Sequence, residues 1–271
     1  MSVEVAKLCI YPIKSMRPLY PDRISVEPRG LQHDRQWMVI DENGRFRTRR
    51  EIPSMAQVGA RFEGDRMILS KDGMPDLSVP CKPEGETVKV QIWTATTTAK
   101  IVSTRANEWM TQAMDAPSRL VRMTTNARRR VNPKLGTGPG WVGFADAYPI
   151  LVASESSLED LNSRLDSPIT VERFRPNIVL RGSLPYEEDT WKNLRIGKVM
   201  LRAARPDIRC LVTTQDPMTG ESRGPEPLKT LATYRRVENG VIFGMYYVPE
   251  KLGMISIGDQ CEPISESMGI C

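Results

Sequence analysis

The sequence contains a single histidine, His33, among 271 residues. Sites that bind zinc or non-haem iron through two or more imidazoles are therefore excluded. A Ser-His-Asp triad would have to use this one residue, and no GxSxG sequence is present. The glycine motifs that hold nucleotide phosphates, GxxxxGK[ST] and a GxGxxG after a strand, are also missing. The common hydrolase and nucleotide-dependent mechanisms thus have no signal in this chain.

The cysteines are few and do not form recognisable pairs. Neither a CxxC sequence nor a zinc-ligand spacing is present, so we expect no disulfide framework and no structural zinc site. The set also lacks the cluster of cysteines that an intrinsic iron-sulfur centre requires. This usage indicates a reducing compartment, and we expect a cytoplasmic protein. The five residues are Cys9, Cys81, Cys210, Cys261 and Cys271.

Long apolar runs and aromatic residues are scarce as well. No stretch approaches the roughly 20 apolar residues of a membrane-spanning helix, so no membrane span is expected. The 38 basic and 33 acidic residues give a net charge of +5, which suits a nucleic acid, an acidic partner protein or an anionic cofactor. Aromatic residues make up only 6% of the chain, and no zinc-finger, homeodomain or RNP signature is present. We therefore expect no nucleic-acid partner.

Short strands joined by turns are the main pattern of the chain. Residues 37–40, an Asn-Gly turn and residues 45–48 predict a hairpin. Apolar and polar residues alternate over residues 87–93, as they do in a half-buried strand. Strands dominate again after Pro168, and one of them is expected at residues 210–214.

Helices are fewer. The longest is expected over residues 154–165, where leucines share one face and Ser156 with Glu159 matches a capping box. Shorter helices are expected at residues 107–114 and 228–234. Many short strands with few helices predict a mostly β (α+β) protein built from barrels or sandwiches rather than alternating βαβ units.

A single thiolate is still able to bind a soft metal. Cys210 follows Arg209 and opens the apolar segment 210–214. Taken alone, such a cysteine is more often a buried packing residue than a ligand, because cysteine is among the most buried residue types. The motifs elsewhere in the chain change that interpretation.

Four motifs occur in one order along the chain: residues 11–15 (YPIKS), 34–40 (DRQWMVI), 174–178 (FRPNI) and 209–217 (RCLVTTQDP). In sequence and spacing they resemble the MOSC-domain superfamily, within the branch of the mitochondrial amidoxime-reducing components and their bacterial relatives. The resemblance implies a β-rich N-terminal domain over residues 1–105, packed on a C-terminal MOSC β-barrel over residues 106–271. It also implies a molybdenum-pterin cofactor between them.

The resemblance assigns roles to particular residues. Cys210 would supply the thiolate to molybdenum. The residues that would hold the pterin, its phosphate or neighbouring polar groups are Lys14, Ser15, Arg35, Arg175, Asn177 and Tyr246. A soft dithiolene metal beside a charged phosphate suits one thiolate with lysine and arginine.

Four of these residues also have an ordinary structural interpretation. Lys14 could be an exposed charge at a strand end, Arg35 and Arg175 could form structural ion pairs, and Asn177 could cap a turn. The chain departs from the family at residues 145–149 (ADAYP), where small hydroxylated side chains are common.

The implied activity is reduction of N-hydroxylated small molecules, such as amidoximes and hydroxylamines, to the N–H form. The implied cofactor is the molybdenum cofactor, without pyridoxal phosphate and without an intrinsic iron-sulfur cluster. Electrons would come from a separate partner of the flavin, haem or ferredoxin type, since this chain has no motif for a redox group of its own. The alternative is a non-catalytic protein that carries the molybdenum cofactor or sulfur.

Overall fold

Strands dominate the fold, and the computed structural model describes them within residues 2–131 and 139–264. Seven of the described strands form a closed barrel, in which pairing between β11 (Ile150–Ser154) and β16 (Gly240–Lys251) joins the two ends of the sheet. The mostly β prediction is confirmed. Around the barrel the strands are β11, β12 (Ile178–Arg181), β1 (Val3–Leu8), β18 (Gln260–Ile264), β13 (Asn193–Ile196), β14 (Val199–Ile208) and β16.

The barrel is filled by side chains that alternate along its strands. In β16, Met245 and Tyr247 are buried in the barrel core, where they join Val5 and Leu8 of β1. Because successive side chains of a strand point to opposite faces, Tyr246 faces away from that core. The same alternation that fills the barrel therefore leaves Tyr246 available to a site outside it.

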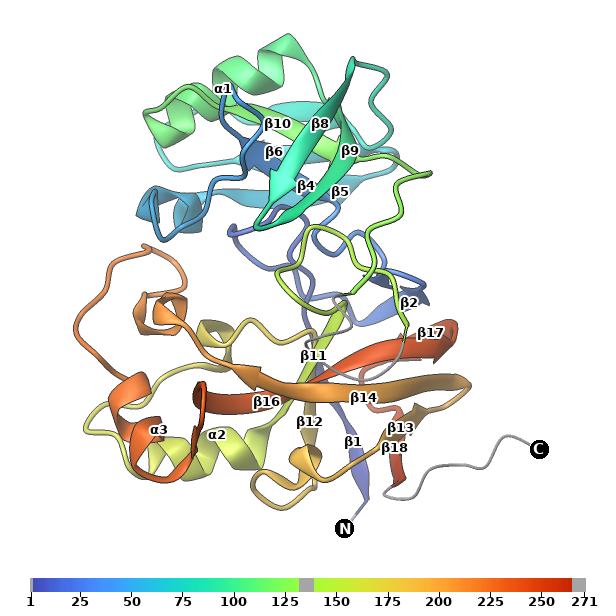
Figure 1. Cartoon of the computed structure of the whole chain (residues 1–271), viewed down its shortest axis with the longest axis vertical. Helices are drawn as coiled ribbons and strands as arrows, with labels where there is room; N and C mark the ends of the chain where they lie inside the picture. Colours follow the sequence, from blue (N-terminus) through green and yellow to red (C-terminus); the bar gives the residue numbers. More distant parts are fainter. Residues whose placement is uncertain (1, 132–138, 265–271) are drawn as a thin grey trace.

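A second set of strands lies above the barrel in Figure 1, together with the first helix. Its apolar core gathers Trp37, Val39, Met67, Leu69 and Met110. These upper strands form two small sheets: β4 (Trp37–Ile40), β10 (Arg119–Met123), β9 (Ala95–Ile101) and β8 (Thr87–Ile92); and β5 (Gly59–Glu63), β6 (Arg66–Ser70) and β7 (Leu77–Pro80). A third small sheet, of β17 (Gly253–Ser256), β2 (Arg23–Glu27) and β3 (Gly30–Leu31), lies beside the barrel (Figure 1) and contributes Ile24, Val26 and Ile255 to the barrel core. The short β15 (Arg236–Val237) pairs with β16.

Strand pairing joins the two parts of the molecule. β1, from the N-terminal region, lies between β12 and β18 as a strand of the barrel. β10, which follows residue 105, pairs with β4 and β9 in the upper part. The division into residues 1–105 and 106–271 therefore remains a prediction, and the hydrogen-bonded sheets cross it in both directions.

The three predicted helices are present: α1 (Thr104–Met114), α2 (Glu155–Asn162) and α3 (Leu228–Tyr234). The predicted cap of α2 is wrong. Ser154, the last residue of β11, accepts a hydrogen bond from the Ser157 backbone and begins the helix, whereas Ser156 lies within it. The strand thus runs directly into the helix without a connecting turn. In the described part of the chain no helix is long and apolar enough to cross a membrane.

Two strand predictions also need correction. The segment 37–40 forms its ladder with β10, and residues 45–48 form no strand. The predicted hairpin is present only in part, through the bridge from Phe46 to Ile40 and the backbone hydrogen bonds from Arg47 to Val39 and from Asp41 to Arg45. The segment after Cys210 is a short 3-10 helix, Leu211–Thr214, rather than a strand. Its geometry has a local cause, because the Thr213 and Thr214 hydroxyls donate to the carbonyl oxygens of Cys210 and Leu211 at 2.9 and 2.8 Å.

Candidate functional site

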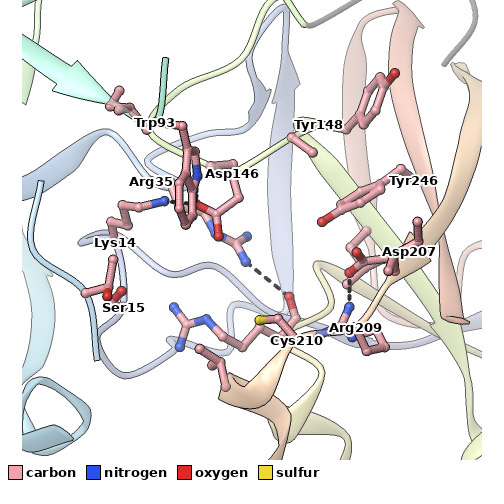
Figure 2. A pocket seen from close by; sticks show the side chains of 18 of the residues that line it. Lys14, Ser15, Arg35, Trp93, Asp146, Tyr148, Asp207, Arg209, Cys210 and Tyr246 are labelled. Carbon is pink, nitrogen blue, oxygen red and sulfur yellow. Dashed lines mark hydrogen bonds and ion pairs between the residues drawn. The ribbon is translucent and has the colours of Figure 1, made fainter. Parts of the chain in front are cut away.

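A cavity of about 430 Å³ collects every residue to which the sequence assigned a role in the site. Its walls come from both parts of the molecule, including the exit of β1, the β8–β9 turn and the end of β14. Figure 2 shows Lys14, Trp93 and Asp146 on one side and Tyr246 with Arg209 on the other. The seven predicted residues that line the cavity are Lys14, Ser15, Arg35, Arg175, Asn177, Cys210 and Tyr246.

The end of β14 directs side chains into the cavity. The register of β14 with β16 shifts between Ala203 and Arg205 and again between Pro206 and Ile208. Such bulges change where side chains point, and they also accommodate a proline that cannot donate to the ladder. Asp207 and Arg209 then form an ion pair at the cavity wall. Cys210 follows at the start of the 3-10 helix, with its backbone still extended.

Cys210 differs from the other described cysteines in exposure. Cys9, Cys81 and Cys261 are buried, and Cys210 is exposed. Burial raises the pKa of Cys9 and Cys261 to about 12, so these thiols stay protonated and unreactive at neutral pH. The sulfur of Cys210 points into the cavity (Figure 2) and accepts a hydrogen bond of 3.2 Å from Arg50 Nη2. Packing does not explain this cysteine.

Lys14 is buried, contrary to its interpretation as an exposed charge. Its Nζ donates to the Phe144 carbonyl oxygen at 2.9 Å and forms an ion pair with Asp146. Asp146 also accepts from Trp93 Nε1 at 3.0 Å. Desolvation would raise the pKa of Asp146, but attraction by Lys14 and the hydrogen bonds from Lys14 and Trp93 hold it below its usual range. This carboxylate is therefore ionised at neutral pH.

Asn177 joins strands at the base of the cavity. Its Oδ1 accepts from the Leu151 backbone at 3.1 Å and from Arg35 Nη1 at 3.1 Å, and its Nδ2 donates to the Cys9 carbonyl oxygen at 3.2 Å. Asn177 is 1% exposed, so replacing it would leave several buried polar groups without partners. Its observed contacts position Arg35, and its predicted contact with a cofactor remains a prediction.

Two arginines enclose one aromatic ring beside the cavity. The guanidinium carbons of Arg35 and Arg175 lie 4.3 and 4.0 Å from the Tyr11 ring centre. Arg35 forms an ion pair with Asp34, as its structural interpretation expects, while Arg175 has no ion pair among the described residues. Arg175 Nη1 donates to the Met16 carbonyl oxygen, and its buried Nη2 has no hydrogen-bond partner there.

The electrostatics of Arg175 follow from this arrangement. Burial lowers the pKa of Arg175 to about 9, although the nearby Tyr11 opposes this shift; repulsion from Arg35 and Arg49 acts in the same direction as burial. The guanidinium is still charged at neutral pH, and a buried charge without a partner is costly. The geometry therefore calls for an anion at Arg175.

Several residues that line the cavity have a strained backbone conformation. Ser15, Arg35, Trp93 and Arg175 all line it, and all have positive φ values, of 70°, 46°, 52° and 57°. Left-handed backbone is unfavourable for side chains other than glycine, and it persists where surrounding contacts enforce it, often at functional sites. Residues from three of the four predicted motifs and Trp93 share this feature.

Comparison with known proteins now decides the family. The profile of the MOSC N-terminal beta barrel domain matches residues 2–117, and that of the MOSC domain matches residues 139–262. The chain belongs to the MOSC-domain superfamily. The resemblance read from the four motifs is thereby confirmed.

The curated relatives of this MOSC protein match it over most of its length. It is 34% identical to mitochondrial amidoxime reducing component 2 of Bos taurus, over 94% of this chain and 81% of the relative. It is 36% identical to mitochondrial amidoxime-reducing component 1 of Mus musculus, over 94% of this chain and 80% of the relative. The protein of that name from Danio rerio is 33% identical, over 94% of this chain and 83% of the relative.

The cavity of this MOSC protein is short of negative charge. Its two carboxylates, Asp146 and Asp207, are already paired with Lys14 and Arg209. Within residues 2–131 and 139–264, no group of three or more histidine, cysteine, aspartate or glutamate side chains is arranged to hold a metal ion. The nine cationic lining residues are Lys14, Arg35, Arg49, Arg50, Arg129, Arg130, Arg175, Arg205 and Arg209.

These features test whether the residues fit a phosphate-bearing cofactor with a soft metal. The surplus of cations and the unpartnered Arg175 Nη2 suit a phosphate. The exposed Cys210 sulfur suits a soft metal, because thiolate is the ligand such metals prefer. The residues present therefore fit the group that the resemblance implies.

Sequence reasoning missed several residues of the site. Asp146 lies in the segment 145–149, which the sequence marked only as a departure from the family. That segment is held close to Arg35: the Phe144 backbone donates to the Arg35 carbonyl oxygen at 2.7 Å, and a Cβ at Gly143 would lie 2.8 Å from the same oxygen. Glycine at 143 thus permits the approach that brings Asp146 to Lys14. Arg49 and Arg50 gave no signal beyond a basic run.

Proposed function

We propose that this protein is a molybdenum-cofactor-dependent oxidoreductase that reduces N-hydroxylated small molecules. The relatives named amidoxime-reducing components support the reaction class. The observation that carries the proposal is the exposed Cys210 sulfur in a cavity with nine cationic side chains. The same cavity thus offers a thiolate for a soft metal and cations for a phosphate.

In this proposal Cys210 holds the metal, while Arg175, with its unpartnered Nη2, and the neighbouring cations hold the phosphate. When bound, the cofactor supplies the two electrons that cleave the N–O bond. The overall change takes up two electrons and two protons, and it releases water and the N–H product. The proton-bearing groups that line the cavity include the Lys14 ammonium and the Tyr246 hydroxyl, which points inward in Figure 2.

The chain's other residues would fix this arrangement before substrate arrives. Arg50 links the Cys210 sulfur to Asp146, with Nη2 at 3.2 Å from the sulfur and 3.9 Å from Asp146 Oδ2. Its guanidinium also lies 5.0 Å from the centre of the Trp93 ring, which is 46% exposed. An exposed indole at the cavity wall offers an apolar surface to the planar part of an amidoxime. Preorganised groups of this kind lower the cost of orienting a substrate.

The proposal is tested with protein purified from a host that makes the molybdenum cofactor. Molybdenum and pterin are measured first, and reduction of benzamidoxime is then followed with an artificial electron donor. We expect about one molybdenum per chain and steady formation of benzamidine. Full loading without reduction would overturn the proposal and favour the carrier alternative.

A separate electron donor is the second part of the proposal. With NADH or NADPH as the only reductant, the purified protein is expected to show no sustained turnover, and added flavin, haem or ferredoxin-type proteins should restore it. An excess of 38 basic over 33 acidic residues would steer an acidic partner, so the restored rate should fall as salt rises.

The reaction with the artificial donor is the control for this salt dependence, because it needs no protein docking. Sustained turnover with the nucleotide alone would contradict the requirement for a partner. A protein-driven rate that responds to salt no more than the control rate would contradict electrostatic steering.

A further inference from the structure

A second cavity, of about 570 Å³, shares no lining residue with the first. One segment of the chain separates them: Gln32, His33 and Gln36 line the second cavity, whereas Arg35 lines the first. The volume lies within the range of small-molecule sites. None of its lining residues takes part in the proposed reaction.

Positive charge predominates in the second cavity. Arg29, Lys82, Arg122 and Arg128 line it, against the single carboxylate of Glu27. None of these five side chains forms an ion pair within 4 Å among the described residues. Burial raises the pKa of Glu27, even against the attraction of Arg122 and Arg29, which weakens the one negative charge available.

Arg29 makes more hydrogen bonds than the other cations of this cavity. Its Nη1 and Nη2 donate to the carbonyl oxygens of Thr124, Thr125 and Ala127 at 3.2, 2.8 and 2.5 Å. It therefore holds the segment that leads to Arg128 in place. Among the described residues, Lys82 and Arg122 make no side-chain hydrogen bond, and Arg128 makes a single long one.

Arg122 shows most clearly that a donor in this cavity is left unused. Its guanidinium carbon lies 5.1 Å from the centre of the Trp37 ring, so the stem is fixed against the core. Its Nε is buried and has no hydrogen-bond partner among the described residues. Burial also lowers the pKa of Arg122, against the opposing influence of Cys81 and Glu27. A buried donor without a partner costs stability that a ligand would restore.

The rest of the wall suits a ligand with an organic body. Arg128 lies over the Trp141 ring, 5.7 Å from its centre, and its Nη1 makes only a 3.4 Å contact with the Thr125 carbonyl oxygen. The His33 ring is stacked on Phe62 at 4.3 Å, and burial lowers its pKa, so it is neutral at pH 7 and able to donate and accept. His33 also has a positive φ of 66°.

We propose that this second cavity binds a small organic polyanion, bearing phosphate or carboxylate groups, between Arg122, Arg128 and Lys82. Guanidinium groups bind both kinds of anion through paired N–H donors. The volume of the cavity leaves room for an organic body beside the His33 ring. Because the cavities are separate, this site operates independently of whether the proposed reaction is correct.

The test uses the whole chain, with pyrophosphate and citrate as probes for the two kinds of anion. Binding is followed through the indole N–H signals in nitrogen-15 NMR spectra, at constant ionic strength set with chloride. We expect saturable shifts of Trp37 and Trp141 beside the second cavity. The Arg122→Gln/Arg128→Gln variant should weaken this binding at least about tenfold, since two charge-assisted contacts are lost.

Trp93 reports on the first cavity in the same spectra, and its response should survive the double substitution. An Arg61→Gln/Arg195→Gln variant removes the same charge at exposed positions and should bind like the parent. Should the double variant fold poorly, Lys82→Gln alone provides a milder test at an exposed residue. Unsaturable shifts, or equal losses in the two double variants, would overturn the proposal. A preference between pyrophosphate and citrate identifies the kind of anion.

Discussion

Replacement of Cys210 by serine is expected to abolish reduction of N-hydroxylated substrates and to leave the fold intact. The thiol is exposed, and its one described side-chain contact is the hydrogen bond from Arg50. Changes at such positions usually alter stability by less than about 0.5 kcal/mol. A serine oxygen is a much harder ligand for a soft metal. We expect turnover to fall by on the order of 100-fold or more, because loss of outer-shell partners alone costs 10–100-fold.

The matched control is Cys81→Ser. Cys81 is buried, 8% exposed, within the core of the upper part, so serine there should reduce stability and leave turnover per molybdenum unchanged. Turnover, metal content and thermal unfolding are measured for both variants. Unchanged turnover in fully loaded Cys210→Ser protein would remove Cys210 from the site.

Cofactor-free protein is expected to gain several degrees of thermal stability from phosphate or sulfate. Arg35 and Arg175 are stacked on one ring, and the buried Nη2 of Arg175 has no partner. An anion that binds only the folded state at a hundred times its Kd adds about 2.7 kcal/mol, or roughly 5–10 °C for a chain of this size. The measurement is the unfolding temperature across a phosphate titration.

Chloride at equal ionic strength separates specific binding from general salt effects. In the Arg35→Ala/Arg175→Ala variant the phosphate response should be strongly reduced. An Arg61→Ala/Arg195→Ala variant has the same change in net charge at exposed positions, and it should respond like the parent. An undiminished response in the Arg35/Arg175 variant would show that the anion does not bind at these arginines.

The broad fold was predictable because its determinants are local. Alternation over residues 87–93 became β8, and the expected helix at residues 228–234 is α3 (Leu228–Tyr234). Errors arose where a side chain competes with the backbone for hydrogen bonds. The hydroxyls of Thr213 and Thr214 turn an apolar, β-branched segment into a 3-10 helix, which periodicity does not reveal.

The site residues that lie within the four sequence motifs could be predicted. The residues named from the four motifs all line one cavity. Asp146 and Arg50 could not be named, because their importance arises from partners far away in sequence, Lys14 and Cys210. Burial of arginines is likewise a tertiary property that depends on which segments come together. A basic run such as residues 47–50 looks the same on a solvated surface.

The place of β1 in the barrel has a consequence for how the protein is made. Gln260 of β18 donates to Glu4 of β1 across a separation of 256 residues. During synthesis this barrel cannot close until β18 has left the ribosome, and closing so long a loop carries a large entropic cost. Lys14 and Ser15 lie just after β1, and Cys210 lies just after β14. The cavity walls are therefore fixed only after β18 has been synthesised, and the proposed cofactor would bind at that late stage.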